Sequence, residues 1–144
     1  MRTLKIAAAQ FEPKDGDKAY NLSVIEKLTE KAKNAGADVI SFHEMSITAY
    51  TFLKDLSLEE VKSFSEKIPG GNATNKLIQI AAKYDITVLA GLLEQEDDQL
   101  YNTYICVDKN GLIAKYRKIH PFISKFLSPG KEYVIFEIKG WKCG

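Results

Sequence analysis

The sequence predicts an α/β protein with parallel strand–helix–strand units in its first half and antiparallel hairpins in its second. The first observation is a pair of apolar runs, at residues 4–9 and 37–42, that flank a segment with helical periodicity. The run at 4–9 is compact and is suited to a buried strand. The second is a set of later apolar runs separated by short polar turns, at 86–92, 101–107 and 112–116. A strand, a helix and a strand within about forty residues form a right-handed parallel unit.

The first helix is expected to begin after Asp17, which can cap it, and to stop at Gly36. Its apolar stripe consists of Leu22, Ile25, Leu28, Ala32 and Ala35. Residues 43–56 lack a clear period and are expected to form a loop. Ser57 and Glu60 match a capping box, which predicts a second helix that ends near Ile68. A third helix is predicted over residues 73–84.

The strands at 86–92, 101–107 and 112–116 barely alternate, so they are expected to be buried on both faces and to need cover on each side. The acidic residues 94–98 are expected to form a solvated turn, and Asp108-Lys109-Asn110-Gly111 is a hairpin signal. A polar loop over 117–132 should precede a last strand at 133–138. Trp141 is the expected start of a short return strand.

The composition predicts one ordinary domain over residues 1–144. The apolar share is 45% and the formal charge is +1, so no field of one sign favours nucleic acid or an anionic membrane. No apolar run approaches the roughly 20 residues of a membrane span. The two cysteines, Cys106 and Cys143, do not form a disulfide framework, which favours reduced thiols and a cytoplasmic location.

Two segments place polar residues where a strand ends, the usual position of functional groups in α/β sheets. Glu44 follows the strand at 37–42, and Lys118 follows the strand at 112–116. Glu44 could be a surface carboxylate or, if partly desolvated, a general base. Lys118 could belong to a solvated basic face or could stabilise an oxyanion. With only two histidines and no phosphate-binding glycine loop, neither a metal nor a cofactor is expected.

The chain resembles the nitrilase superfamily, the carbon-nitrogen hydrolases, in collinear segments that span nearly its whole length. These segments are Ile6 to Phe11, Phe42 to Tyr50, Tyr101-Asn102-Thr103, Asn110-Gly111 with Lys115 to His120, and Ser128-Pro129-Gly130. The resemblance implies an α-β-β-α sandwich, usually paired as a dimer. It also implies a Glu-Lys-Cys triad that hydrolyses small amides or nitriles through a thioester, with Glu44 as the base and Lys118 as the cation.

The sequence differs from the family pattern in several places. His43 stands where Pro is common and Ala49 where Gly is common, and residues 119–131 lack the acidic residue that many members carry. Gly144 matches the Gly that precedes the family's nucleophile strand. The nucleophilic Cys is therefore expected just beyond residue 144, and Cys143 is expected to fill a strand. On this basis the domain is truncated, and the chain alone should lack amidase activity.

Two other functions fit parts of the sequence. The chain could be a non-catalytic α/β interaction module, or a pseudoenzyme that pairs with a full-length homologue. A flavodoxin-like nucleotide binder suits the early strand–helix–strand units but lacks a phosphate loop and does not explain residues 115–120. A monodisperse, cooperatively folding chain would favour the interaction module.

Overall fold

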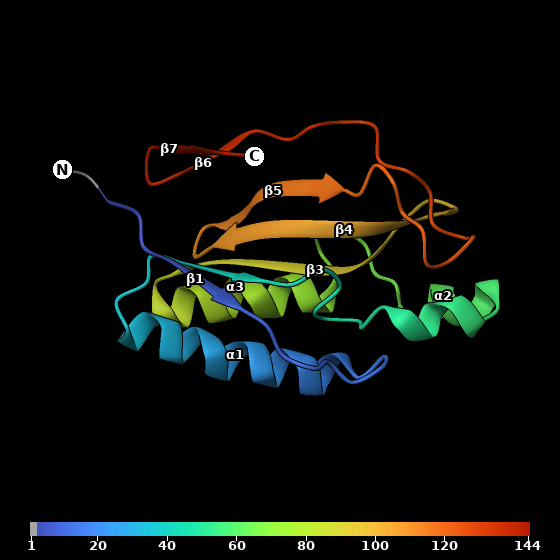
Figure 1. Cartoon of the computed structure of the whole chain (residues 1–144), viewed down its shortest axis with the longest axis horizontal. Coiled ribbons are helices and arrows are strands. Elements are labelled where there is room, and N and C mark those ends of the chain that lie inside the picture. Colours follow the sequence, from blue (N-terminus) through green and yellow to red (C-terminus); the bar gives the residue numbers. More distant parts are fainter. Residues whose placement is uncertain (1–2) are drawn as a thin grey trace.

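The structure, a computed structural model, describes residues 3–144 and has three layers (Figure 1). Helices α1 (Lys18–Asn34) and α3 (Asn72–Tyr84) cover one face of a five-stranded sheet. A strand pair, β6 (Phe136–Ile138) and β7 (Trp141–Cys143), lies over the other face. A short 3-10 helix (Thr51–Asp55) and α2 (Leu58–Phe64) lie beside one end of the sheet. The α/β class is confirmed, with an α-β-β order of layers.

The sheet has the order β1-β2-β3-β4-β5. β1 pairs parallel with β2 and β2 with β3, whereas β3, β4 and β5 pair antiparallel. The predicted change from parallel units to hairpins is therefore confirmed. The bounds of the strands are Ile6–Ala9, Val39–Phe42, Thr87–Glu96, Gln99–Asp108 and Gly111–Arg117.

The predicted helix starts are confirmed by their caps. The Asp17 side chain accepts the backbone N–H of Tyr20 at 2.9 Å. Ser57 and Glu60 make both bonds of the capping box. Helix α2 ends at Phe64, before the predicted end at Ile68, because Glu66 leaves the helix to exchange backbone bonds with β3.

The main core lies between the two long helices and the sheet. Ile25 of α1 and Leu77 of α3 are fully buried there against strand residues such as Val88 and Ile105. Contiguous apolar burial of this kind is the dominant favourable term in folding. It fixes the sheet from the helical side and leaves the other face of the sheet for β6, β7 and the candidate site.

The outer strands of the sheet are less buried than the sequence predicts. β5 is half-buried along its whole length, so the prediction of two-sided burial fails for it. β1 alternates between exposed and half-buried residues, and Ile6 is 61% exposed. Both strands lie at the edges of the sheet, so each has one neighbouring strand, whereas β3 and β4 each have two.

The last predicted strand is shorter than expected. Residues 133–135 are not in a strand, and the side chains of Tyr133 and Ile135 are 89% and 73% exposed. The strand starts only at Phe136, where pairing with β7 begins at Cys143. The predicted return strand at Trp141 is confirmed.

Candidate functional site

The chain between β2 and the 3-10 helix is a buried loop that lies along β3 and carries Glu44 at its start. The backbone N–H of Ile47 donates to the Gly91 carbonyl at 3.0 Å. The hydroxyls of Ser46 and Thr48 accept the N–H groups of Gly91 and Leu93. These bonds satisfy backbone groups that burial removes from water. The loop therefore holds Glu44 in a defined position at the carboxyl end of β2.

Positive backbone φ angles allow the loop to turn sharply. Met45 has a φ of 54° and Ala49 a φ of 69°. A non-glycine residue in this region costs about 1–2 kcal/mol. The angle at Ala49 lies in the region that glycine adopts at the lowest cost, so alanine carries some backbone strain there.

Glu44 and Lys118, the two residues singled out by the sequence, lie in contact. Lys118 Nζ donates to Glu44 Oε1 at 2.8 Å. Asn102 of β4 also donates its side-chain N–H to Glu44 Oε1. The hydrogen bond to Glu44 raises the pKa of Lys118 above its ordinary value, although desolvation opposes the shift. Lys118 is therefore a firmly protonated cation beside a carboxylate.

The pair lines a cavity of about 350 Å³ that also contains Phe42, Asn102, Tyr104 and Tyr116. The Tyr104 hydroxyl donates to the Phe42 carbonyl, which secures the end of β2 just before Glu44. The Glu44 side chain is 42% exposed. The carboxylate is thus more open to solvent than the desolvated base expected from its position after an apolar strand.

The prediction that residues 94–98 form a solvated turn is wrong, because Glu94 is a buried residue of β3. Its side chain is 1% exposed and receives Lys115 Nζ at 2.7 Å and Arg117 Nη2 at 2.7 Å. The Thr103 hydroxyl donates to it at 2.6 Å. The turn proper consists of Asp97 and Asp98 only. The sequence held a signal for this cluster, because Lys115 and Arg117 stand two apart on a strand and so share one face.

Glu94 is ionised in spite of its burial. Burial by itself would raise the pKa of this carboxyl, but the hydrogen bonds from Arg117, Lys115 and Thr103 together hold it below its ordinary value. These residues lie on the opposite face of β4 and β5 from Asn102 and Lys118, because neighbouring residues of a strand point to opposite faces. The basic run from Lys115 to Lys118 therefore contacts Glu94 and Glu96 on one face and Glu44 on the other.

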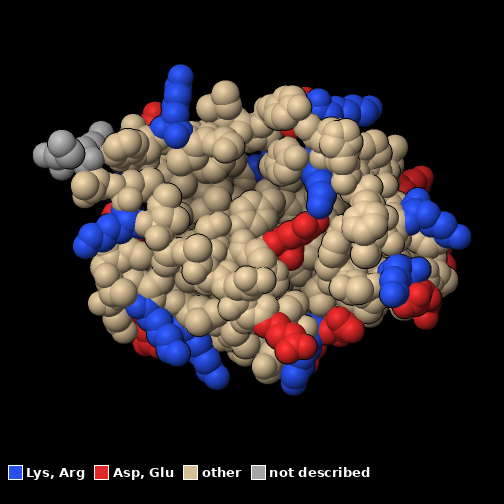
Figure 2. Space-filling view, viewed as in Figure 1, with Lys and Arg blue, Asp and Glu red and all other residues tan. Residues whose placement is uncertain are grey.

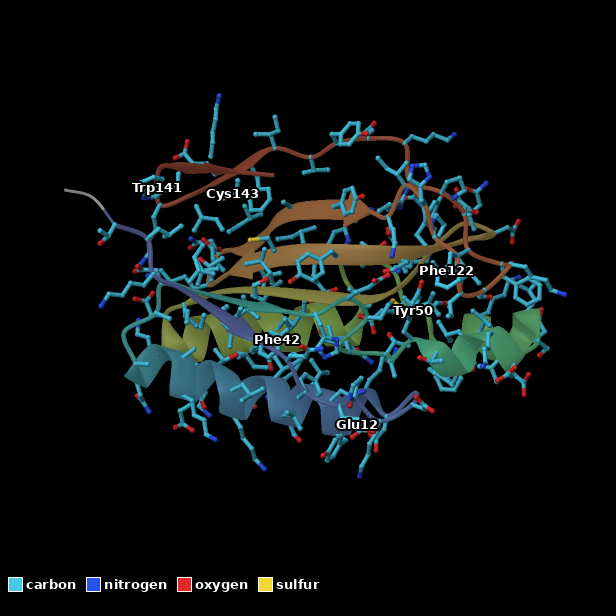
Figure 3. The ribbon with its side chains drawn as sticks, viewed as in Figure 1. Glu12, Phe42, Tyr50, Phe122, Trp141 and Cys143 are labelled. Atoms are coloured by element: carbon cyan, nitrogen blue, oxygen red, sulfur yellow. The ribbon has the colours of Figure 1, made fainter. Side chains whose placement is uncertain are left out.

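The two cysteines lie away from Glu44. Tyr50 marks the position of the site in Figure 3, because its ring centroid is 5.9 Å from Lys118 Nζ. Cys143 of β7 lies well apart from Tyr50 in that view. It packs with Cys106 in a small apolar cluster that includes Val39 and Ile138. Burial raises the pKa of the Cys106 thiol to about 12, which suppresses the reactive thiolate. Cys143 is half-buried in this cluster, in keeping with a strand-filling role.

Charged side chains lie mainly around the rim of the molecule in the view of Figure 2, and most of the interior of that view is uncharged. Among residues 3–144, no group of three or more His, Cys, Asp or Glu side chains is arranged to hold a metal ion. In the same range, every helix is too short or too polar to cross a membrane.

Comparison with known proteins gives a consistent family. The family model described as carbon-nitrogen hydrolase matches residues 5–144. This chain belongs to the carbon-nitrogen hydrolase family. A nitrilase from Pyrococcus abyssi is 34% identical over 144 residues, which cover 98% of this chain and 54% of that protein. The omega-amidase from Homo sapiens is 32% identical over 157 residues, which cover 100% of this chain and 54% of that protein.

Solved structures show the same carbon-nitrogen hydrolase fold. The amidase from Nesterenkonia sp. AN1, crystallised with acrylamide as a double mutant, superposes with a TM-score of 0.76 at 20% identity. That match covers 96% of this chain and 53% of the amidase. The chain spans about half the length of the curated relatives it matches.

Proposed function

We propose that this chain is the part of a carbon-nitrogen hydrolase that supplies the general base, Glu44, and the oxyanion-stabilising cation, Lys118. The observation that carries the proposal is the 2.8 Å contact between these two side chains at the wall of a cavity. Glu44 follows β2 and Lys118 follows β5, so the two strand ends place them together. The family of the chain supports hydrolysis of a carbon–nitrogen bond.

The proposed substrate is a small amide or nitrile, and the proposed nucleophile is a Cys thiol just beyond Gly144. For an amide, Glu44 accepts the thiol proton as the sulfur bonds to the carbonyl carbon. Lys118 stabilises the negative oxygen of the tetrahedral intermediate. The C–N bond breaks, Glu44 returns the proton to the leaving amine, and a thioester remains. Water then loses a proton to Glu44 and attacks the thioester carbon. The C–S bond breaks, Glu44 passes the proton to the sulfur, and the acid is released as the thiol is restored.

The first test reads the coding sequence beyond codon 144. The family resemblance leads us to expect an Ile-Cys-x-Asp segment within about ten codons. A clean stop with no such segment in any frame would favour the non-catalytic interaction module instead.

The same protein is proposed to be cytoplasmic and to pair as a homodimer or higher oligomer, and sedimentation of the purified protein checks the pairing.

The second test measures ammonia release from small amides and nitriles by the protein that contains this chain and its continuation. Glu44→Gln and Lys118→Ala should each lower kcat by about 100-fold or more, because each removes a group that acts in the transition state. Glu59→Gln, an exposed carboxylate in the first turn of α2, is the matched control and should keep full activity. Wild-type turnover by the Glu44→Gln variant would refute the assignment.

The 144-residue chain alone is expected to release no ammonia. Its two thiols lie in an apolar cluster that shares no residue with the lining of the Glu44 cavity. Intact-mass measurement after incubation with an amide should therefore show no acyl adduct. A thioester at Cys143 would overturn this expectation and place the nucleophile within the chain.

A further inference from the structure

Asn102 contacts both members of the candidate pair through different atoms. Its side-chain N–H donates to Glu44 Oε1, and its backbone carbonyl accepts the N–H of Lys118 at 2.9 Å. Lys118 Nζ completes the circuit with its own bond to Glu44 Oε1 at 2.8 Å. Asn102 of β4 and the residues that follow β2 and β5 thus form a closed ring of contacts.

The strand β4 gives Asn102 a fixed position from which to hold the other two. Asn102 is 4% exposed and faces Leu93 across the β3–β4 ladder. Glu44 and Lys118 are both partly open to solvent, with side-chain exposures of 42% and 34%. A long exposed side chain loses rotamer entropy when it is held in one geometry. The hydrogen bond from the buried Asn102 amide, which its strand already orders, offsets part of that cost.

The ring engages only one oxygen of the carboxylate. Within residues 3–144, the hydrogen bonds and the ion pair of Glu44's side chain all involve Oε1. A carboxylate oxygen has about two lone-pair sites, and two donors occupy those of Oε1. Oε2 accepts no hydrogen bond from the described residues, and the side chain that carries it lines the cavity.

We propose that Asn102 is a positioning residue that fixes the Glu44 carboxylate through Oε1 and leaves Oε2 as the oxygen that exchanges protons. The role of Oε2 rests on the proposed hydrolase function. The positioning of Glu44 and Lys118 by Asn102 does not, because it concerns contacts that exist without substrate. The two parts can therefore be tested separately.

Thr103, the next residue of β4, provides a matched control. It is fully buried, and its hydroxyl donates to Glu94 on the opposite face of the strand. Thr103→Val removes one buried hydrogen bond from the same strand without touching Glu44 or Lys118. A purely structural effect of losing a polar group in β4 should appear in both variants.

The positioning is tested by following the NMR titration of Lys118 in the 144-residue chain. The bond to Glu44 raises the Lys118 pKa, so loss of the Asn102 contact should lower the titration midpoint toward the ordinary value of 10.5. Asn102→Leu should produce this shift and Thr103→Val should not. Glu44→Gln gives the shift in the Lys118 midpoint that is expected when the ion pair is lost completely. Asn102→Ser replaces Asn102→Leu if the leucine variant fails to fold.

An unchanged Lys118 midpoint in a folded Asn102 variant would overturn the positioning role, as would an equal shift in Thr103→Val. In the active protein with its continuation, Asn102→Leu should lower kcat by about 10-fold or more with little change in KM. A KM effect alone would mean that Asn102 binds substrate instead. If the protein with its continuation hydrolyses no amide or nitrile, the proposed function fails. The Lys118 titration still shows whether Asn102 positions Glu44 and Lys118.

Discussion

Glu94 is a charged side chain that is buried from water. The carboxylate is almost completely removed from water, and its charge is balanced by Lys115 and Arg117 from the edge strand β5. A buried ion pair contributes little net stability, but removal of one partner leaves an uncompensated charge. The cluster therefore links β5 to β3, and Lys118 follows directly on β5.

Glu94→Gln should lower the free energy of unfolding by about 3 kcal/mol at pH 7, because the two cations lose their charged partner. Urea denaturation monitored by circular dichroism measures the change. Glu96→Gln, whose side chain is 53% exposed in contact with the same Arg117, is the control and should cost less than about 1 kcal/mol. Equal losses in the two variants would show that burial of Glu94 is unimportant.

The same carboxylate predicts a dependence on acid. Glu94 has a folded-state pKa below its ordinary value of 4.5, so its contribution is complete above that pH. It is lost as the pH falls through the folded-state value. The stability difference between wild type and Glu94→Gln should therefore shrink between pH 7 and pH 3. A constant difference over this range would contradict an ionised Glu94.

Residue roles were predictable where the strand ends are clear and unpredictable where only the fold brings residues together. Glu44 and Lys118 each follow a strand, and the structure places them in contact. Asn102 lies in a segment that resembles the family, but nothing local predicted its contacts, because they join two segments that are distant in the sequence. Glu94 stands in an acidic run, and local composition alone favours a solvated turn for it.

At the scale of elements, the loop that carries Glu44 depends on its close approach to β3. A Cβ atom added at Gly91 would lie 2.3 Å from the Met45 backbone nitrogen. No rotamer change can relieve such a clash, because the neighbouring atom belongs to the backbone. The absence of a side chain at Gly91 thus allows the residue that follows Glu44 to pack directly on the sheet.

Gly91→Ala should destabilise the protein by about 3 kcal/mol, the upper range for overpacking, and should displace Glu44 from Lys118. Thermal unfolding checks the first effect, and the Lys118 titration checks the second. Gly36→Ala is the control because it has a φ of 81° with its nearest neighbouring atom 3.7 Å away. It should cost about 1 kcal/mol from backbone strain and leave Lys118 unchanged. A normal Lys118 titration in Gly91→Ala would contradict this account of the loop.

Helices and inner strands followed the sequence pattern more closely than the edges did. The caps at Asp17 and Ser57 predicted two helix starts, because a cap is a local hydrogen bond. The apolar runs of β1 and β5 suggested burial, but their burial depends on which strands lie beside them. Residues 133–135 are as apolar as a strand and have no strand partner in the structure.

At the scale of the whole molecule, the two faces of the sheet differ. Helices α1 and α3 pack tightly on one face. The other face and the segment from Tyr133 to Gly144 enclose a groove of about 620 Å³ with mainly apolar walls, including Ile6, Leu89 and Phe136. Exposed apolar surface of this kind favours self-association. The exposed side chains of Tyr133 and Ile135 add to it.

Tyr133→Lys combined with Ile135→Lys should raise the soluble concentration of the 144-residue chain and reduce its association in sedimentation experiments. Both side chains are largely in solvent, so the change in unfolding free energy should stay within about 0.5 kcal/mol. Ile138→Lys is the opposite case, because Ile138 is 4% exposed and packs on Val39 and Cys106. It should unfold the strand pair at a cost of several kcal/mol, since a lysine there has no partner. Unchanged association in the double variant would mean that other surfaces, such as the β1 edge with Ile6, drive contact between copies.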